Sequence, residues 1–301
     1  MDGTPDRRPV GRGGLTLGRL GLGTAPIGGL FEAVREDQAA ATLQAAWDAG
    51  VRYFDTAPHY GAGLAERRLG AFLTPARRAE AVVSSKVGRL LRPDGTQVRD
   101  YSRDGVYRSL AGSLERTGLD AFDLLYIHDP DDYWAEAVGE AYPALERLRD
   151  EGAVKAIGVG MNQTHLLSRF VAETDVDCVM VAGRYSLLDR EAARDLLPRC
   201  RERGVAVIVA GVFNSGVLAD PRPGAHFDYA PAGEAVLDRA RAMARRCAAY
   251  GVPLSAAAVR YPLRHPAVTG VVVGARTPAE VSAATTAPPV PEPLWAELEE
   301  L

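Results

Sequence analysis

The chain has 301 residues, of which 47% are hydrophobic and 25% charged, so it can bury a large core and suits one closed α/β barrel as well as two smaller domains. The formal net charge of −4 gives no reason to expect a nucleic-acid partner, because such binding depends on a concentrated basic surface. Neither a membrane-spanning apolar run nor a signal peptide is recognisable, so we expect a cytoplasmic protein without a membrane partner.

The beginning of the chain is rich in glycine and arginine. We expect residues 1–12 to be flexible and residues 13–301 to form a single domain. Two glycine-bounded apolar pieces, residues 15–17 and 20–22, predict a β-hairpin that closes the floor of a barrel.

Short β-branched runs then alternate with amphipathic helical patterns along the whole chain. The predicted strands are residues 20–25, 51–56, 81–88, 123–129, 154–160, 176–183, 205–211 and 268–274. The predicted helices are residues 36–49, 103–117, 134–150, 164–173, 190–203 and 234–250. Each interval suffices for a crossover helix, so the strands should be parallel neighbours, and eight such units predict a (β/α)8 TIM barrel, an α/β fold.

A doubly wound Rossmann sheet is the competing fold, but its G-x-G-x-x-G fingerprint follows none of the predicted strands. Two long connections, residues 89–102 and 212–233, contain no predicted strand. Because loops of this length in a compact domain are often functional, we interpret both as lids.

The active site of a (β/α)8 barrel lies at the carboxyl ends of its strands, where this sequence places several ionisable residues. Asp55 ends one strand and is followed by His59 and Tyr60, while Lys86 and His128 end the next two. A buried lysine needs a partner that offsets its lost hydration, and Asp55 is the candidate. A positive charge stabilises phenolate, so we expect Tyr60 to have a lowered pKa and to act as a general acid/base. His128 is the candidate donor to a substrate oxygen.

Other interpretations remain open for these residues. Asp55 and Lys86 can be a structural ion pair and His128 a core histidine. A metal-dependent barrel hydrolase uses a similar set of residues, although the first predicted strand carries no histidine. A cofactor-binding regulatory protein with little turnover is a further alternative.

No metal site is expected from the cysteines. Cys178, Cys200 and Cys247 have neither zinc-site nor disulfide spacing, so we interpret them as reduced and structural. The acids Asp129, Asp131 and Asp132 are interpreted as solvated or helix-capping.

Three motifs, FDTAPHYG, SSKVG and YIHD, resemble in this order the Asp, Tyr, Lys, His tetrad of the aldo-keto reductases. The resemblance extends from GLGTAPIGG to VVVGARTPAEV. It implies a barrel oxidoreductase that uses NADP or NAD and transfers a hydride to or from an aldehyde, ketone or sugar lactol. By this match Tyr60 moves the proton, Lys86 and Asp55 tune it, and His128 orients the substrate.

The same resemblance implies a nicotinamide dinucleotide across the barrel mouth. Asn162 would bind the carboxamide and Tyr185 would stack on the ring, while Met161 and Ala182 stand where the family commonly has serine and glutamine. The strings AGRYSLLD and GVFNSGVLAD are similar to the bacterial aldose and pyridoxal 4-dehydrogenase branch, in which NAD is common. The expected cofactor-binding set is Gly23, Thr24, Asp55, Asn162, Tyr185, Phe213, Asn214, Ser215, Gly216, Leu218, Gly274, Arg276 and Glu280.

The string VVVGARTPAEV predicts a strand, a turn and a helix with Thr277 as N-cap, Pro278 at its first position and Glu280 three residues after the cap. The start of that helix, preceded by Gly274 and Arg276, is a suitable anion site. Arg276 favours the additional phosphate of NADP, but it can also stack on adenine or remain solvated, so the choice between NADP and NAD stays open.

Tyr133 and Trp134 follow His128 and are predicted to line the substrate pocket, with a core anchor as the alternative for Trp134. The chain ends without a long loop after its last helical segment, so we expect an open site for a small polyol, lactol or vitamin-like aldehyde. The sequence leaves the oligomeric state open, a homo-oligomer included.

Overall fold

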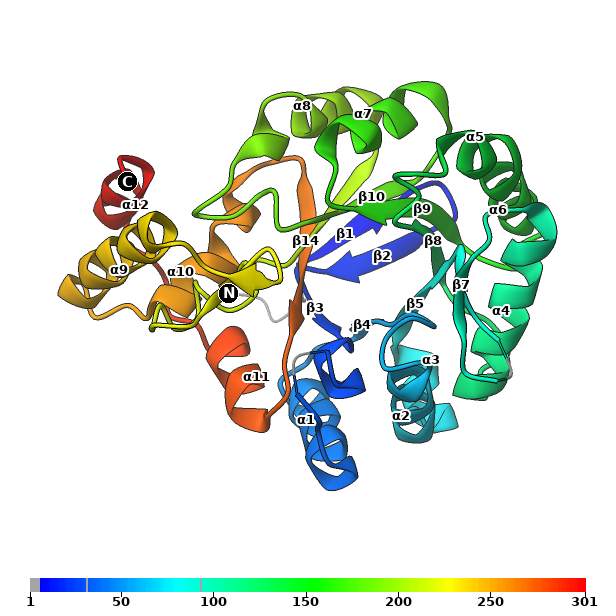
Figure 1. Cartoon of the computed structure of the whole chain (residues 1–301), viewed down its shortest axis with the longest axis horizontal. Coiled ribbons are helices and arrows are strands. Elements are labelled where there is room, and N and C mark those ends of the chain that lie inside the picture. Colours follow the sequence, from blue (N-terminus) through cyan, green and yellow to red (C-terminus); the bar gives the residue numbers. More distant parts are fainter. Residues whose placement is uncertain (1–5, 31, 93) are drawn as a thin grey trace.

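Eight parallel strands close into a barrel in the computed structural model, which describes residues 6–30, 32–92 and 94–301 (Figure 1). In their order around the barrel they are β3 (Leu20–Gly23), β4 (Tyr53–Asp55), β5 (Val82–Val87), β8 (Leu124–His128), β9 (Ala156–Met161), β10 (Cys178–Ala182), β11 (Ala206–Ala210) and β14 (Val268–Gly274). Strand β14 pairs with β3 and so closes the ring. All eight agree with the predicted strands to within two residues at either end, which confirms the (β/α)8 barrel.

Helices surround the barrel and cover the outward faces of its strands (Figure 1). They are α1 (Glu36–Asp48), α2 (Leu64–Phe72), α3 (Pro75–Glu80), α4 (Arg103–Thr117), α5 (Trp134–Glu136), α6 (Tyr142–Asp150), α7 (Thr164–Glu173), α8 (Leu196–Arg203), α9 (Glu234–Ala249), α10 (Leu254–Arg260), α11 (Pro278–Thr285) and α12 (Glu292–Glu299). Four short turns of other helix types join them: η1 (Pro26–Gly28), η2 (Ala137–Ala141), η3 (Glu191–Ala193) and η4 (Pro262–Arg264). Because both faces of each strand are covered, the strands read as continuous apolar runs.

The predicted helix over residues 134–150 is interrupted. Its middle, η2, is a π-helical segment that separates α5 from α6. Pro143 lies at the start of α6 and has no N–H to donate to the preceding turn, which accounts for the wider turn at this point. The short helices α2, α3 and α10 were not predicted, since six to nine residues show too few turns for a clear period.

A hairpin of β1 (Arg7–Val10) and β2 (Leu15–Gly18) closes the barrel floor. Figure 1 shows it across the centre of the barrel, and Val10, Leu15 and Leu17 join the apolar interior. The turn of the hairpin lies against Lys155 and Asp177, which precede β9 and β10, so this is the amino-terminal end of the strands.

The closing hairpin was predicted, but its strands were assigned wrongly. Residues 20–22 belong to barrel strand β3, and residues 7–10, predicted to be flexible, form β1. The sequence of β1 is RRPV, with one buried apolar residue, so it carries no alternation that would reveal a strand. Residues 1–5 of the segment predicted to be flexible lie outside the described residues.

The two long connections at the barrel mouth contain small antiparallel hairpins, so their prediction as strandless is wrong. One hairpin pairs β6 (Arg89–Leu91) with β7 (Gln97–Arg99), and the other pairs β12 (His226–Phe227) with β13 (Ala230–Pro231). Ladders of two or three residues are too short for a periodic signal. The hairpins follow β5 and β11, so they rise from the same end of the barrel.

Candidate active site

The side chains of three adjacent strands alternate between the barrel interior and the helical layer. The interior positions are Tyr53 and Asp55 on β4, Val82, Ser84 and Lys86 on β5, and Leu124, Tyr126 and His128 on β8. In each strand the apolar or aromatic residues lie toward the floor and the ionisable residue lies last. This register brings Asp55, Lys86 and His128 together at the mouth, as predicted.

Asp55 and Lys86 form a buried ion pair. The distance from Lys86 Nζ to Asp55 Oδ2 is 2.6 Å, and both side chains are at most 3% exposed. Lys86 also donates to the carbonyl of Thr56 at 3.0 Å, and Ser84 donates to Asp55 Oδ1 at 2.7 Å. A buried pair is stable only when such additional hydrogen bonds satisfy the remaining lone pairs and protons. The predicted partnership of Asp55 and Lys86 is therefore present.

Two polar residues that the sequence analysis missed or placed elsewhere support this pair. Ser84 lies two residues before Lys86 on the same face of β5, so the period of a strand could have revealed it. Thr24, expected at the cofactor, is buried, and its backbone N–H and hydroxyl both donate to the carbonyl of Asp55. Thr24 thus fixes the end of β4, and a methyl group added at the neighbouring Gly23 would approach Val272 to 3.0 Å.

Tyr60 lies between this ion pair and His128. The Lys86 ammonium is 4.8 Å from the centre of the Tyr60 ring, and the Tyr60 and His128 rings meet edge to face at 5.9 Å. Burial raises the pKa of Tyr60 to about 12, although the charge of Lys86 acts in the opposite direction. The expectation of a lowered pKa is therefore wrong, because desolvation of the phenolate outweighs the attraction to Lys86.

The pKa of Lys86 is also raised, to about 12. Burial, the largest single effect, disfavours the charged form, but the charges and hydrogen bonds of Asp55 and Tyr60 together outweigh it. Lys86 is therefore a cation and Tyr60 a neutral phenol at physiological pH. A protonated phenol beside a fixed ammonium is arranged to donate a proton.

His128 is a buried neutral imidazole. Burial and the neighbouring cations Lys86 and Arg89 hold its pKa well below the usual range. Its Nε2 atom is 3.6 Å from Asp129, whereas Nδ1 is buried and has no hydrogen-bond partner among the described residues. A neutral ring can donate one hydrogen bond to an uncharged substrate oxygen.

Asn162 follows β9 and faces the mouth. Its amide nitrogen donates to the carbonyl of Ala182 at 2.8 Å, while its amide oxygen accepts no hydrogen bond from the described part of the chain. The neighbouring Gly183 has a positive φ of 71°, and a Cβ there would lie 3.6 to 3.8 Å from the side chains of Asn162, Asn214 and Asp228. A fixed amide with an available oxygen suits the carboxamide of a nicotinamide ring.

Tyr185 does not pack against Tyr60 or His128. Its ring packs against Tyr261 and His265, with ring centres at 5.6 and 5.8 Å. Tyr261 follows α10, and His265 precedes the amino-terminal end of β14. The side chain therefore lies in the outer layer, where it cannot stack on a ring beside Tyr60.

The loop after β11, expected to bind the pyrophosphate, is held by its own side chains. Asn214 is buried, donates to the carbonyl of Gly183 at 2.9 Å and accepts from the hydroxyl of Ser186. Leu218 is buried in the core. Asn214, Ser215 and Gly216 all have positive φ, so the loop is tightly wound. The Asn214 side chain therefore holds the loop in shape, and its predicted part in binding the pyrophosphate stays a prediction.

The start of α11 is already occupied by a carboxylate. Thr277 accepts from the N–H of Glu280, as predicted for an N-cap, and Glu280 accepts from the backbone N–H of Arg276 at 2.7 Å. The Arg276 guanidinium donates to Glu280 at 3.0 Å and to Glu32 at 2.6 Å. At the predicted anion site, Glu280 therefore binds the backbone N–H of the residue before the N-cap, and two acids flank one arginine. Gly274, at the end of β14, is exposed beside it.

The two residues predicted to line the substrate pocket lie in different surroundings. Trp134 packs against Phe170 with the ring centres 4.6 Å apart and the planes tilted by 60°, and the Arg169 guanidinium lies over its ring, as in the core-anchor alternative. Tyr133 packs on Tyr101 at 5.1 Å. The hydroxyl of Tyr101 donates to the carbonyls of His128 and Asp129, so Tyr133 is close to the end of β8.

Four charged residues at the mouth were not predicted as site residues. Arg89 pairs with Asp129 at 2.6 Å, and Arg184 pairs with Asp228 at 2.8 Å. Asp129 is therefore a partly exposed member of an ion pair. Each pair joins segments at least 40 residues apart, and nothing in the local sequence announces such a contact.

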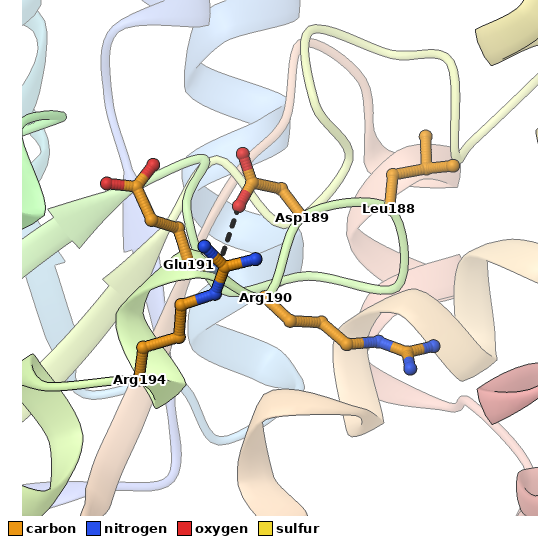
Figure 2. A pocket seen from close by; sticks show the side chains of 5 residues that line it. All are labelled: Leu188, Asp189, Arg190, Glu191 and Arg194. Atoms are coloured by element: carbon orange, nitrogen blue, oxygen red, sulfur yellow. Dashed lines mark hydrogen bonds between the residues drawn. The ribbon is translucent and has the colours of Figure 1, made fainter.

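A surface hollow of about 360 Å³ lies elsewhere, around η3. Figure 2 shows its lining side chains, which are Leu188, Asp189, Arg190, Glu191 and Arg194. None of these belongs to the group around Tyr60, and open solvent contacts most of them.

The described residues offer neither a metal-binding cluster nor a membrane-spanning helix. There, His, Cys, Asp and Glu side chains do not gather in a group of three that could hold a metal ion. No helix in that part of the chain is both long and apolar enough to cross a membrane.

The fold and this group of residues define a (β/α)8-barrel enzyme whose ionisable side chains meet at the carboxyl ends of adjacent strands. The model of the Aldo/keto reductase family matches residues 19–301, and the chain belongs to that family. It is a nicotinamide-dependent oxidoreductase, which confirms the predicted class, and the metal-hydrolase and regulatory alternatives find no support.

Two relatives match nearly the whole chain. D-threo-aldose 1-dehydrogenase of Pseudomonas sp is 45% identical, with 95% of this chain and 94% of that protein covered. Pyridoxal 4-dehydrogenase of Microbacterium luteolum is 41% identical, with 92% and 91% covered. Both lie in the predicted branch. Among solved structures, the holo form of an aldo-keto reductase from Bacillus halodurans superposes with a TM-score of 0.82 at 24% identity over 99% of this chain and 96% of that one, which shows the fold.

Proposed function

We propose that the chain interconverts an alcohol or sugar lactol and the corresponding carbonyl compound or lactone, with NAD as the preferred cofactor and Tyr60 as the residue that moves the proton. The observation that supports this proposal is the packing of the Tyr60 phenol between the buried Asp55–Lys86 pair and the neutral imidazole of His128. The names of the two similar dehydrogenases also favour aldose and aldehyde substrates.

In this proposal the nicotinamide supplies or accepts the hydride at the substrate carbon. His128 donates a hydrogen bond that directs the substrate oxygen toward Tyr60. During reduction Tyr60 donates its proton to that oxygen, and Lys86 stabilises the phenolate that results. During oxidation Tyr60 must first lose its proton. Because its pKa is raised, we expect oxidation to become faster as the pH becomes alkaline.

Several residues would hold the cofactor. The free amide oxygen of Asn162 suits the carboxamide, the tightly wound loop at Ser215 and Gly216 suits the pyrophosphate, and the start of α11 suits the adenosine end. The two acids at the start of α11 favour NAD, because Glu32 and Glu280 leave a net negative charge around Arg276. Carboxylates accept hydrogen bonds from ribose hydroxyls, whereas they repel an additional phosphate.

The test is the variant Tyr60→Phe. Without its hydroxyl the site cannot move the proton, so kcat should fall by about 10²- to 10⁴-fold. Fluorescence titration should show NADH affinity within about threefold of the wild-type value, because the ring remains in place. Tyr107→Phe on α4 is the matched control and should retain full turnover. Comparable activity of Tyr60→Phe and wild type would show that the proton moves through another group.

A further inference from the structure

Asp129 and Arg89 form an ion pair beside His128. Arg89 Nη1 is 2.6 Å from Asp129 Oδ2, and the two side chains are 22% and 28% exposed. Asp129 Oδ2 is also 3.6 Å from Nε2 of His128. The pair therefore adjoins the residue that directs the substrate oxygen, and it is open enough to contact a substrate.

The backbone of Asp129 is held in an uncommon conformation. Its φ is +45°, a region that residues other than glycine seldom adopt. Its N–H donates to the carbonyl of Gly160 at 2.9 Å, and its carbonyl accepts from the hydroxyl of Tyr101 at 2.7 Å. Strained backbone of this kind persists where the surroundings fix it, commonly at functional sites. Here it turns the carboxylate back toward His128 instead of outward to solvent.

Arg89 is fixed from a second side. Its Nη2 lies 2.8 Å from Nε2 of His59, and His59 in turn is hydrogen-bonded to Gln97 of the β6–β7 hairpin. Contacts on two sides thus hold the guanidinium in place before a ligand binds, which limits the entropy lost on binding. The Arg89 guanidinium, a donor, and the Asp129 carboxylate, an acceptor, therefore lie side by side.

Tyr229 lies on the other hairpin at the mouth and is 62% exposed. It lies in the turn between β12 and β13, where Asp228 and Tyr229 have φ of +49° and +63°, and the charges of both Asp129 and Arg89 act on its hydroxyl. The Arg184–Asp228 ion pair and the hydrogen bond from Tyr229 N to Ser215 hold this turn in place. The substrate site is thereby bounded by polar groups on two sides.

We propose that Asp129 and Arg89 bind a hydroxyl group of the substrate close to its reacting carbon, and so select hydroxylated aldehydes and sugar lactols over unsubstituted aldehydes. A hydroxyl both donates and accepts, which matches a carboxylate next to a guanidinium. A substrate without that hydroxyl desolvates the pair with no compensating hydrogen bond. This inference depends on the proposed function.

The experiment compares glyceraldehyde with propanal, which has the same carbon chain without hydroxyls. Wild type should reduce glyceraldehyde with a kcat/KM about 10²-fold higher. Asp129→Asn, a residue that tolerates positive φ, should lower kcat/KM for glyceraldehyde about 10- to 100-fold and change that for propanal by less than about threefold. Arg89→Gln should show the same selective loss. Asp132→Asn is the control, because Asp132 is an exposed acid on the same loop.

The possible outcomes separate the two proposals. Equal kcat/KM for both aldehydes in wild type, or an equal loss for both in Asp129→Asn, would overturn the hydroxyl-binding role and leave the proposed function standing. If the wild-type protein bound no nicotinamide nucleotide, the proposed function would fail and the inference with it.

Discussion

Glu280 holds two donors that a phosphate would otherwise bind, the backbone N–H and the guanidinium of Arg276. A negative charge at the start of a helix is favourable, so the carboxylate and a phosphate compete for one position. At the scale of single residues, cofactor choice therefore depends on the acids around Arg276 as well as on the arginine itself.

The variant Glu280→Gln should shift this choice. Removal of the charge should strengthen NADPH binding about 10-fold while NADH binding changes by less than about threefold, because one like-charge repulsion of roughly 1.4 kcal/mol is lost. Calorimetric titration with each nucleotide measures both values. Glu292→Gln is the control, because Glu292 is an acid on α12 that pairs with Arg264, far from the start of α11 in the chain. An unchanged ratio of affinities would remove the basis for the proposed NAD preference.

The tetrad could be read from the sequence because each member ends or follows a strand, and strand ends meet at one place in a barrel. The role of Tyr185 could not, because its direction depends on packing against Tyr261. The sign of the Tyr60 pKa shift was also beyond the sequence, since it is the difference between burial and the charge of Lys86.

At the scale of elements, the floor hairpin and the mouth are separate. Leu17 of β2 is fully buried in the interior cluster, at the end of the barrel opposite the tetrad. The hairpin should therefore contribute to stability without contributing to chemistry.

Leu17→Ala should lower the free energy of unfolding by about 2 to 5 kcal/mol, the usual cost of a cavity at a buried leucine. Urea unfolding gives this value, and kcat of the folded variant should stay within about twofold of wild type. Arg8→Ala changes the exposed cross-strand partner of Leu17 and should cost no more than about 0.5 kcal/mol. A loss below about 1 kcal/mol for Leu17→Ala would show that the hairpin packs only loosely on the barrel.

For the molecule as a whole, the buried ion pair links stability to alkaline pH. The chain has two lysines, Lys86 in the pair and Lys155, whose side chain is 58% exposed. The pKa of Lys86 is about 12 in the folded state against an ordinary 10.5, so the folded protein binds the proton more tightly. This contribution is fully present below the ordinary pKa and is lost as pH rises through 12.

We therefore expect the free energy of unfolding to fall by about 2 kcal/mol as pH rises from well below 10.5 to well above 12, and further because the raised pKa of Tyr60 acts in the same direction. Denaturant unfolding at a series of pH values measures the slope. Lys155→Met should retain the loss, whereas Lys86→Met, already less stable at neutral pH, should show a smaller one. Parallel slopes for the two variants would contradict the link to Lys86.

The sequence by itself determined the barrel, the eight strands and the positions of Asp55, Lys86 and His128 at strand ends, because strand period and strand ends are local properties of the chain. Only the tertiary structure decided which strands close the floor. It also decided that Tyr185 packs on Tyr261, that Trp134 packs on Phe170, and that Arg89 meets Asp129 at the mouth. The physical reason is that these contacts join residues distant in the chain, and burial and packing decide them.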